Sequence, residues 1–396
     1  MSFQYNFDQL KDAITFATVE VLPTDPAQLD SEIKKLIQLA NSSVQPIRHY
    51  IGFEISGQIH IGGGLFQMQK CAKLQQAGVE IVFWMADYHT WLNSKLDGKI
   101  ETIKKVARDY FAPVLLKTFE IAGGDPSLAK VIYNYDDYRT FKDDKMFWDY
   151  EFQCDRELSL SRVLRSLSIT GKSAGEDVFY QLTRYPGMQA ADVFWLQTHF
   201  VQSGMDQRKI YVSTRDIAHK IDEDYRLKIG NVEVKPICMF SKLLYGLTPP
   251  TTDPETGEVL IAKMSKSVPD SCIFGNDSSL EIARKLKKAY CPMVQEGQGI
   301  EQIETEQALN PILDWCENMI FPGNKVLEVE RPDKFGGNVN YDNYQGLKTD
   351  YYAGKLHPMD LKNAVAKCLS SWFAPILELC ENECKEGYEL VKSLRK

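Results

Sequence analysis

The sequence predicts an α/β protein with an open, mostly parallel sheet, followed by a separate α-helical region. Three observations predict this fold. A strand, a glycine-bearing turn, a helix and a second strand follow one another early in the chain, further short apolar runs alternate with helical stretches, and strand signals fade past about residue 300. The 396 residues are enough for one large domain and a smaller one.

The first βαβ unit is the best-defined element. Residues 48–53 predict a strand, residues 65–78 (LFQMQKCAKLQQAG) have helical apolar spacing, and residues 79–86 (VEIVFWMA) form a nearly continuous apolar run. Such a run is typical of a strand that is buried on both faces, and the crossover should be right-handed. Further candidate strands are residues 130–135, 198–202 and 236–240.

The remaining segments predict the domain organisation. Residues 1–45 read as an N-terminal helical lead-in because residues 26–42 have apolar positions at helical spacing. Residues 46–300 should form the α/β domain, in which the Pro- and Thr-rich residues 247–267 form a surface loop. Residues 301–396 should be helical, with helices near 308–320 and 361–379 and a loop at 321–337 between them.

Composition limits the possible classes of protein. The formal net charge of -8 argues against non-specific coating of nucleic acid, and no window approaches the roughly 18 apolar residues of a membrane span. The first residues lack the pattern of a signal peptide, and nine cysteines occur without zinc-like spacing. We therefore expect a cytoplasmic globular protein that has reduced thiols, no membrane association and no metal site of its own.

Two short motifs point to chemistry. The turn at residues 60–63 reads HIGG, and residues 263–267 read KMSKS within the predicted surface loop. Each alone has a plain structural explanation, as a tight turn and as a solvated basic run. Together they resemble the HIGH and KMSKS signatures of the class I aminoacyl-tRNA synthetases, which have a Rossmann-like catalytic domain. The resemblance implies His60, Lys263 and Lys266 as catalytic residues.

The reaction that this resemblance implies explains those residue types. An amino-acid carboxylate attacks the α-phosphate of ATP, and pyrophosphate leaves. The nucleophile is already ionised, so catalysis consists of positioning and of stabilising negative charge on the phosphates. Histidine and lysine donors serve that purpose. The resemblance implies ATP as a substrate, with Mg²⁺ arriving with it.

A helical stripe suggests the amino acid. Tyr185, Gln189 and Asp192 lie at i, i+4 and i+7 of a helix that begins at Pro186, although such a stripe is equally consistent with a solvated face. Tyr50 lies on the strand before the HIGG turn. Six segments together resemble the archaeal and eukaryotic type of tyrosyl-tRNA synthetase: YIGFEISGQIHIGG, MADYH, YPGMQAAD, GMDQRKI, KMSKS and KKAYCP.

This resemblance, over about residues 45–375, implies roles for individual positions. It implies that L-tyrosine contacts Tyr50 and Asp192 through its phenol, and Tyr185, Gln189 and Gln207 through its ammonium group. It implies that ATP and the adenylate contact Gly52, Glu54, His60, Gly62, Lys263, Ser265 and Lys266. A carboxylate that faces a tyrosine hydroxyl would be left unpaired by phenylalanine, and discrimination between these two substrates is the established example for this enzyme class.

The resemblance extends to the helical region and to the partners. ERPDKFGG and KLHPMDLKNAVA resemble the family's anticodon-binding domain, in which Phe335 would stack on the first anticodon base of tRNA(Tyr) and Asp360 would accept from a guanine edge. Asp360 also suits the first turn of a helix after Pro358, where an acid complements the helix dipole. The family implies a homodimer.

One position departs from the family pattern. Gly63 stands where the HIGH motif ends in a second histidine, whereas Lys266 stands where many relatives carry serine. We expect the lysine of one motif to restore the donor that is missing from the other. Two alternatives stay open: a tryptophan–tRNA ligase, and a non-catalytic RNA-binding paralogue.

Overall fold

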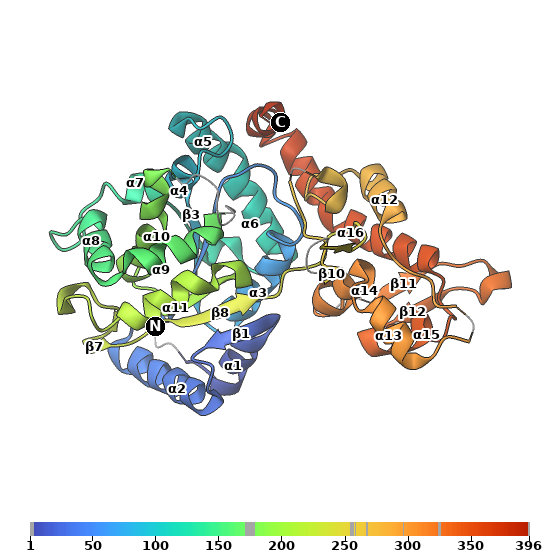
Figure 1. Ribbon diagram of the computed structural model, residues 1–396, viewed down its shortest axis with the longest axis horizontal. Helices are drawn as coiled ribbons and strands as arrows, with labels where there is room; N and C mark the ends of the chain where they lie inside the picture. Colours follow the sequence, from blue (N-terminus) through green and yellow to red (C-terminus); the bar gives the residue numbers. More distant parts are fainter. Residues whose placement is uncertain are drawn as a thin grey trace.

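The computed structural model describes residues 4–394, except 171–178, 254–256, 258, 267, 296 and 324–325. Its core is a six-stranded sheet in the order β1-β8-β5-β2-β3-β4 (Figure 1). Neighbouring strands from β8 to β4 pair in parallel, whereas β1 pairs with β8 antiparallel. The strands are β1 (Thr18–Leu22), β2 (Arg48–Phe53), β3 (Glu80–Met85), β4 (Lys130–Tyr133), β5 (Phe200–Gly204) and β8 (Ile237–Ser241).

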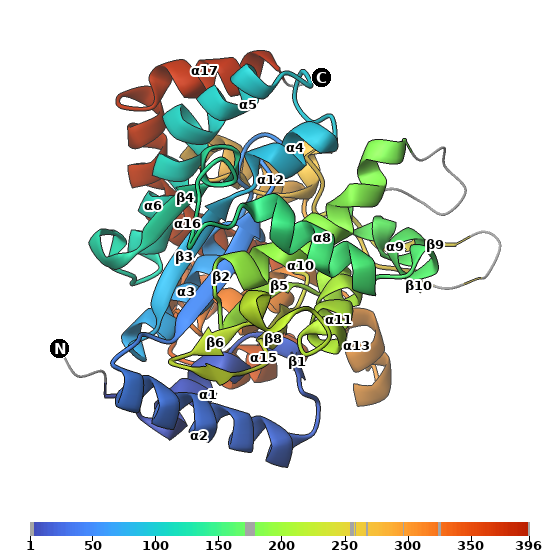
Figure 2. The same ribbon diagram turned by 90° about the vertical axis from the view of Figure 1, so that its left-hand side faces the viewer.

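Helices cover both faces of this sheet, as an open α/β fold requires (Figure 2). On one side lie α3 (Leu65–Gln76) and α6 (Ala112–Ile121), and on the other lie α8 (Phe147–Glu157), α10 (Tyr185–Trp195) and α11 (Arg208–Ile217). The chain leaves β2 through α3 towards β3, and leaves β5 through α11 towards β8. The two crossovers run in opposite directions, so a crevice opens between the carboxyl ends of β2 and β5.

The predicted strands of the α/β domain are confirmed to within about two residues. The predicted helical lead-in is correct only in part, because residues 1–45 contain β1 between α1 (Phe7–Thr15) and α2 (Pro26–Ser43). The short β1 is an edge strand whose hydrogen-bonding partner, β8, lies more than 200 residues away, so the local pattern could not reveal it. The buried Lys70 ties this segment to α3 by donating to the Ile14 carbonyl at 2.6 Å.

The C-terminal part is mainly helical. Its helices are α12 (Ser279–Lys288), α13 (Ile300–Gln307), α14 (Pro311–Trp315), α15 (Tyr344–Tyr352), α16 (Pro358–Glu381) and α17 (Lys385–Ser393). Helix α12 precedes the predicted boundary at residue 300 but packs against α16, and both lie in the right-hand part of Figure 1. This packed unit therefore begins before residue 300.

Two predicted loops contain short strands. Within residues 321–337, β11 (Leu327–Val329) pairs antiparallel with β12 (Val339–Tyr341), so the expectation of a plain loop between helices was wrong there. Within residues 247–267, β9 (Thr251–Thr252) pairs with β10 (Val259–Leu260). Each of these strands forms only because a second strand pairs with it across a turn. A short sequence rich in proline and glycine does not predict that pairing.

The cysteines and the helices bear on two expectations from composition. All nine cysteines are free, and most of them are buried. Across the described parts of the chain, no helix combines the length and apolar character that crossing a membrane requires.

Candidate active site

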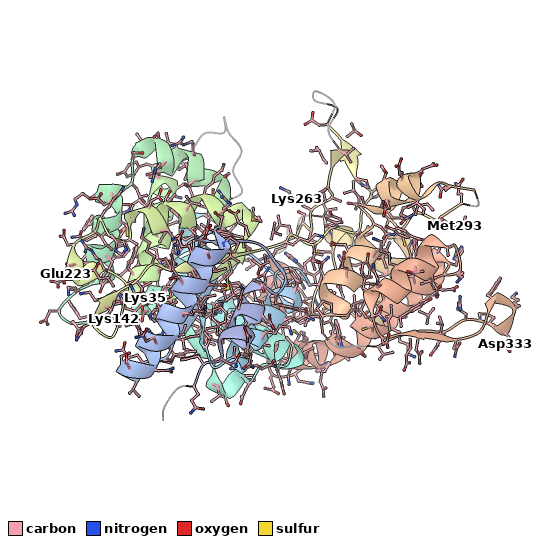
Figure 3. The ribbon with its side chains drawn as sticks, turned by 90° about the horizontal axis from the view of Figure 1, so that it is seen from below. Lys35, Lys142, Glu223, Lys263, Met293 and Asp333 are labelled. Carbon is pink, nitrogen blue, oxygen red and sulfur yellow. The ribbon has the colours of Figure 1, made fainter. Side chains whose placement is uncertain are left out.

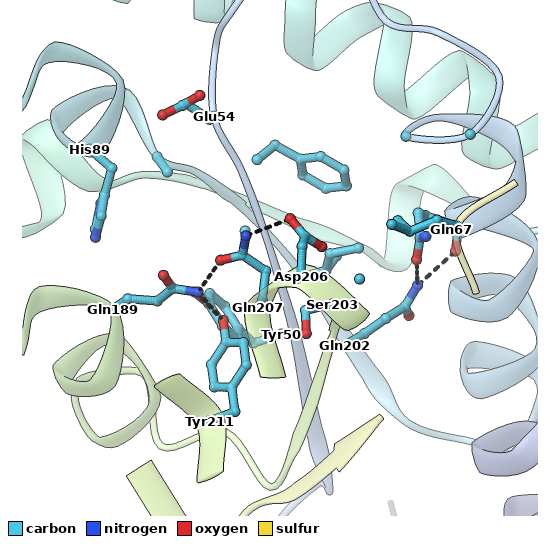
Figure 4. Close-up of a pocket in the computed structure, with 18 of the residues that line it drawn as sticks. Tyr50, Glu54, Gln67, His89, Gln189, Gln202, Ser203, Asp206, Gln207 and Tyr211 are labelled. Atoms are coloured by element: carbon cyan, nitrogen blue, oxygen red, sulfur yellow. Dashed lines mark hydrogen bonds between the residues drawn. The ribbon is translucent and has the colours of Figure 1, made fainter. Parts of the chain in front are cut away.

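A cavity of about 470 Å³ opens at the crevice between β2 and β5. Strand ends, the first turns of α10 and the segment around Lys263 line it, so segments more than 200 residues apart in sequence meet there. The predicted site residues that line it are Tyr50, Gly52, Glu54, His60, Gly62, Tyr185, Gln189, Asp192, Gln207 and Lys263. Figure 4 shows several of these side chains reaching inward from both sides of the crevice.

One end of the cavity contains a buried acid and a buried phenol. Asp192 is 1% exposed and Tyr50 is 2% exposed, so the solvated-face alternative for the α10 stripe is wrong. The Tyr138 hydroxyl donates to Asp192 Oδ1 at 2.6 Å, and the Tyr211 hydroxyl donates to that of Tyr50 at 3.5 Å. Burial raises the pKa of Asp192 well above its usual value, and the hydrogen bond from Tyr138 opposes that shift. This end suits a ligand group that offers a proton to a carboxylate.

Beside this pair lies a group of amide and hydroxyl side chains. Gln189 Nε2 donates to the Tyr211 hydroxyl at 3.0 Å and to Gln207 Oε1 at 3.1 Å, as Figure 4 shows. Gln207 Nε2 in turn donates to Asp206 Oδ2 at 2.8 Å. The buried Gln189 Oε1 has no hydrogen-bond partner among the described residues. These oxygen acceptors suit a primary ammonium group of a ligand.

The opposite end of the cavity contains the HIGG turn. The Gly63 N–H donates to His60 Nδ1 at 3.3 Å, so the proton of a neutral imidazole lies on Nε2. Burial, with the nearby charge of Lys266, lowers the pKa of His60 to about 3, which keeps the ring neutral. A Cβ at Gly62 would lie 3.0 Å from Met264 Sδ, so glycine lets this turn approach the 263–266 segment closely.

The lysines of that segment take different positions. Lys263 lines the cavity, whereas Lys266 Nζ donates to Ser56 Oγ at 2.8 Å. Burial lowers the pKa of Lys266 to about 8, although the charge of Glu54 raises it. The Ser265 N–H donates to Ser271 Oγ at 2.9 Å. Ser267, the last residue of the motif, lies outside the described residues.

The donors at this end fit a triphosphate. A neutral histidine N–H and two lysine ammonium groups converge beside the turn that leads into α3. Within the described ranges, no group of three or more His, Cys, Asp or Glu side chains could hold a metal ion.

Comparison with known proteins agrees with this geometry. The family model for class I tRNA synthetases (W and Y) matches residues 42–374. The chain belongs to this family.

Individual relatives are similar over nearly the full length. A protein of Thermococcus sibiricus, named tyrosine–tRNA ligase, is 38% identical, with 94% of this chain and 96% of the relative covered. A crystal structure of tyrosyl-tRNA synthetase complexed with L-tyrosine from Pyrococcus horikoshii is 36% identical, has a TM-score of 0.84 and covers 98% of this chain and 100% of its own. A tryptophanyl-tRNA synthetase from Aeropyrum pernix K1, at 17% identity and a TM-score of 0.60, shares the fold.

Sequence reasoning missed several residues of the synthetase cavity. His89, Asp206 and Tyr211 line it. Tyr138 is not among the lining residues but donates a hydrogen bond to Asp192, which is. His89 belongs to the MADYH segment, and Asp206 to GMDQRKI, so both lay within recognised stretches without an assigned role. Tyr138 lies between residues 110 and 180, where the resemblance is weaker, and no local signal marks it.

The two predicted anticodon residues lie in the C-terminal part of the synthetase, away from the cavity. Phe335 is 61% exposed in the short η9 helix (Asp333–Phe335), and Asp360 lies in the first turn of α16. Arg331 Nη1 donates to the Lys355 carbonyl at 2.8 Å, which joins the two neighbouring segments. Figure 3 shows Asp333 at the tip of this part, far from Lys263.

Proposed function

We propose that this synthetase is a tyrosine–tRNA ligase, which activates L-tyrosine with ATP and transfers it to tRNA(Tyr). The observation that carries the proposal is the buried pair of Asp192 and Tyr50 at the closed end of the cavity. A desolvated carboxylate is costly unless a ligand or a neighbour donates to it, and a phenol hydroxyl both donates and accepts. Relatives named tyrosine–tRNA ligase are 36–38% identical to the chain, which favours tyrosine over tryptophan.

The amino acid would bind with its phenol between Asp192 and Tyr50. Its ammonium group would then lie near Tyr185, Gln189 and Gln207, where the unpartnered Gln189 Oε1 is available as an acceptor. This orientation directs the carboxylate towards the HIGG turn, because His60 and Lys263 line the other end of the same cavity.

Activation would take place at that other end. The tyrosine carboxylate attacks the α-phosphate of ATP beside Gly52, Glu54 and Gly62, which releases pyrophosphate and needs no general base. The His60 Nε2–H, Lys263 and Lys266 donate to phosphate oxygens and stabilise the charge that develops on the leaving group. Ser265 holds the lysine segment in place through Ser271. Mg²⁺ that enters with ATP would neutralise part of the triphosphate charge.

A non-catalytic RNA-binding paralogue is the alternative from another class. Two lysines argue against this alternative: Lys263 lines the cavity and Lys266 lies beside it. A protein that no longer bound ATP would not need a cavity with cations at one end and a buried acid at the other. Pyrophosphate exchange with tyrosine and tryptophan in parallel tests all three functions. We expect exchange with tyrosine; exchange with tryptophan alone, or with neither, would reject the proposal.

Anticodon reading would use the separate C-terminal part. Phe335→Ala and Asp360→Ala should slow charging of tRNA(Tyr) without slowing pyrophosphate exchange, because these residues are far from the cavity. The effect should vanish on a minihelix that lacks the anticodon. Loss of pyrophosphate exchange in folded variants would instead show that the domain assignment is wrong.

We propose that the enzyme acts as a homodimer in the cytoplasm. The support for a dimer is a set of large apolar side chains that are at least half exposed on α8 and α9 (Leu160–Ser166): Phe152, Leu160 and Leu164. A contiguous exposed apolar patch marks an interface between subunits, and we propose that these three side chains form one. Sedimentation of Leu160→Glu against the unmodified chain tests this: a monomer is expected for the variant, and an unchanged dimer would exclude this surface.

A further inference from the structure

His89 presents a buried nitrogen that the proposed function does not use. Its side chain is 2% exposed on α4 (Asp87–Leu92) and lines the cavity near Gln189 (Figure 4). Among the described residues, Nε2 has no hydrogen-bond partner. Asp192 Oδ2 lies 3.8 Å away, which is beyond hydrogen-bond length. A buried polar atom of this kind needs a partner, and a ligand in the cavity can supply one.

The neighbours of His89 determine which of its nitrogens carries the proton. Asn134 Oδ1 accepts from the Tyr88 N–H at 2.8 Å, and a backbone N–H can only donate. The Asn134 amide group is therefore oriented with its Nδ2 towards His89 Nδ1, at 2.9 Å. Because Nδ2 can only donate, His89 Nδ1 must accept, so the proton of the neutral ring lies on Nε2.

The ring is also kept neutral and held in place. Burial lowers the pKa of His89 to about 3, so the imidazole is uncharged at neutral pH. Its ring packs edge-on against that of Tyr185, with 4.7 Å between the ring centroids. His89 Nε2 is thus a single, oriented donor on the cavity wall, close to the carboxyl group of Asp192.

We infer that His89 is a specificity-determining residue: its Nε2–H donates to the phenol oxygen of the substrate while Asp192 accepts the phenol proton. An oxygen about 2.8 Å from both atoms completes a triangle across the 3.8 Å gap that separates them. The inference rests on the proposed function, because it supposes that tyrosine is the ligand. Asn134 then acts as a positioning residue that sets the tautomer of His89.

This arrangement recognises a group that donates and accepts at once. A phenol hydroxyl does both, whereas phenylalanine offers neither interaction. The amine of 4-aminophenylalanine can donate to Asp192, but its lone pair is delocalised into the ring and accepts poorly. The response of these three ligands to loss of His89 should therefore differ.

Equilibrium binding of L-tyrosine, L-phenylalanine and L-4-aminophenylalanine to the full chain without ATP provides the test. His89→Leu should weaken tyrosine binding by about 10- to 100-fold, since one buried donor is lost, and should change the other two by less than about threefold. His89→Gln should recover part of the loss because its amide can donate. Asn134→Leu, which leaves His89 without a fixed tautomer, should weaken tyrosine binding by a smaller factor.

The control is His199→Leu, because His199 is a second buried histidine and contacts Arg48 and Lys228 outside the cavity. It should not alter the ratio of tyrosine to phenylalanine affinity. Equal weakening of all three ligands in His89→Leu would indicate a packing role, and unchanged tyrosine binding would exclude the contact; either outcome overturns the inference. Pyrophosphate exchange by the unmodified chain separates the proposed function from the role of His89. If exchange proceeds with tyrosine while His89→Leu keeps its full preference for tyrosine over phenylalanine, the proposed function stands and only the role of His89 is wrong.

Discussion

The two ends of the cavity are built differently. At the amino-acid end, Asp192 on α10 and Tyr50 on β2 are almost fully buried, and the hydroxyls of Tyr138 and Tyr211 orient them. At the phosphate end, Lys263 is exposed on the segment that follows β10, and His60 lies on a turn. Buried, oriented groups discriminate between ligands because an unpaired partner is costly, whereas positive charge near solvent attracts any triphosphate. Selectivity and rate are therefore expected to depend on separate sets of residues.

The largest effect is expected at the phosphate end. Lys266→Ala should raise the barrier to tyrosine activation by about 2.7 to 4 kcal/mol, by analogy with a lost transition-state donor, and should do so for any amino acid that binds. Pyrophosphate exchange measures it, with Lys117→Ala on α6 as a control that should change little. If the loss depended on which amino acid is bound, the separation of the two ends would be wrong.

The next effect is expected at the amino-acid end. Asp192→Ala should weaken tyrosine activation by about 1 to 3 kcal/mol, because the phenol loses its acceptor in a desolvated pocket, while phenylalanine should suffer much less. The variant should stay folded, since burial already disfavours the charged carboxylate, and thermal unfolding checks this. Equal losses for tyrosine and phenylalanine in pyrophosphate exchange would contradict a role in binding the phenol.

A smaller effect should follow from pH. The pKa of Lys266 is lowered to about 8, so its charge is present below that pH and is lost above it. The apparent affinity for ATP should therefore fall by about tenfold between pH 7 and pH 9. Lys266→Arg, which keeps its charge, should remove this dependence. The same pH profile in both proteins would assign the titration to another group.

The smallest effect concerns Gly63. A Cβ there would lie 3.5 Å from His60 Cε1, an ordinary contact, so a side chain can be added. If Lys266 replaces the donor that a second histidine would supply, Gly63→His should recover part of the activity of Lys266→Ala, about 0.5 to 1.5 kcal/mol. A double-mutant cycle on the exchange rate measures the coupling. A gain from Gly63→His that is the same with and without Lys266 would reject compensation.

Some features of the fold and of the site could be predicted from the sequence, because they leave a pattern in a short segment of the chain. The strands at 48–53 and 79–86 were predictable because burial on both faces leaves an apolar run in the local sequence. The HIGG and KMSKS motifs were recognisable because close approach to a triphosphate limits which residues a short segment can carry. The spacing of one helix placed Asp192 on the same face as Tyr185 and Gln189, but its role in binding the phenol came only from the resemblance to the family.

Other features were decided only by the tertiary structure. β1 needs β8 as a partner, and α12 belongs with α16, although the chain between them is long. The contact of Tyr138 with Asp192, and the tautomer of His89 set by Asn134, arise where separate helices meet. The sequence alone determined the parallel strands of the sheet, the motifs and the family, because these depend on short-range patterns. The oriented partners of Asp192 depend on distances between remote segments, which only the folded chain brings to hydrogen-bond length.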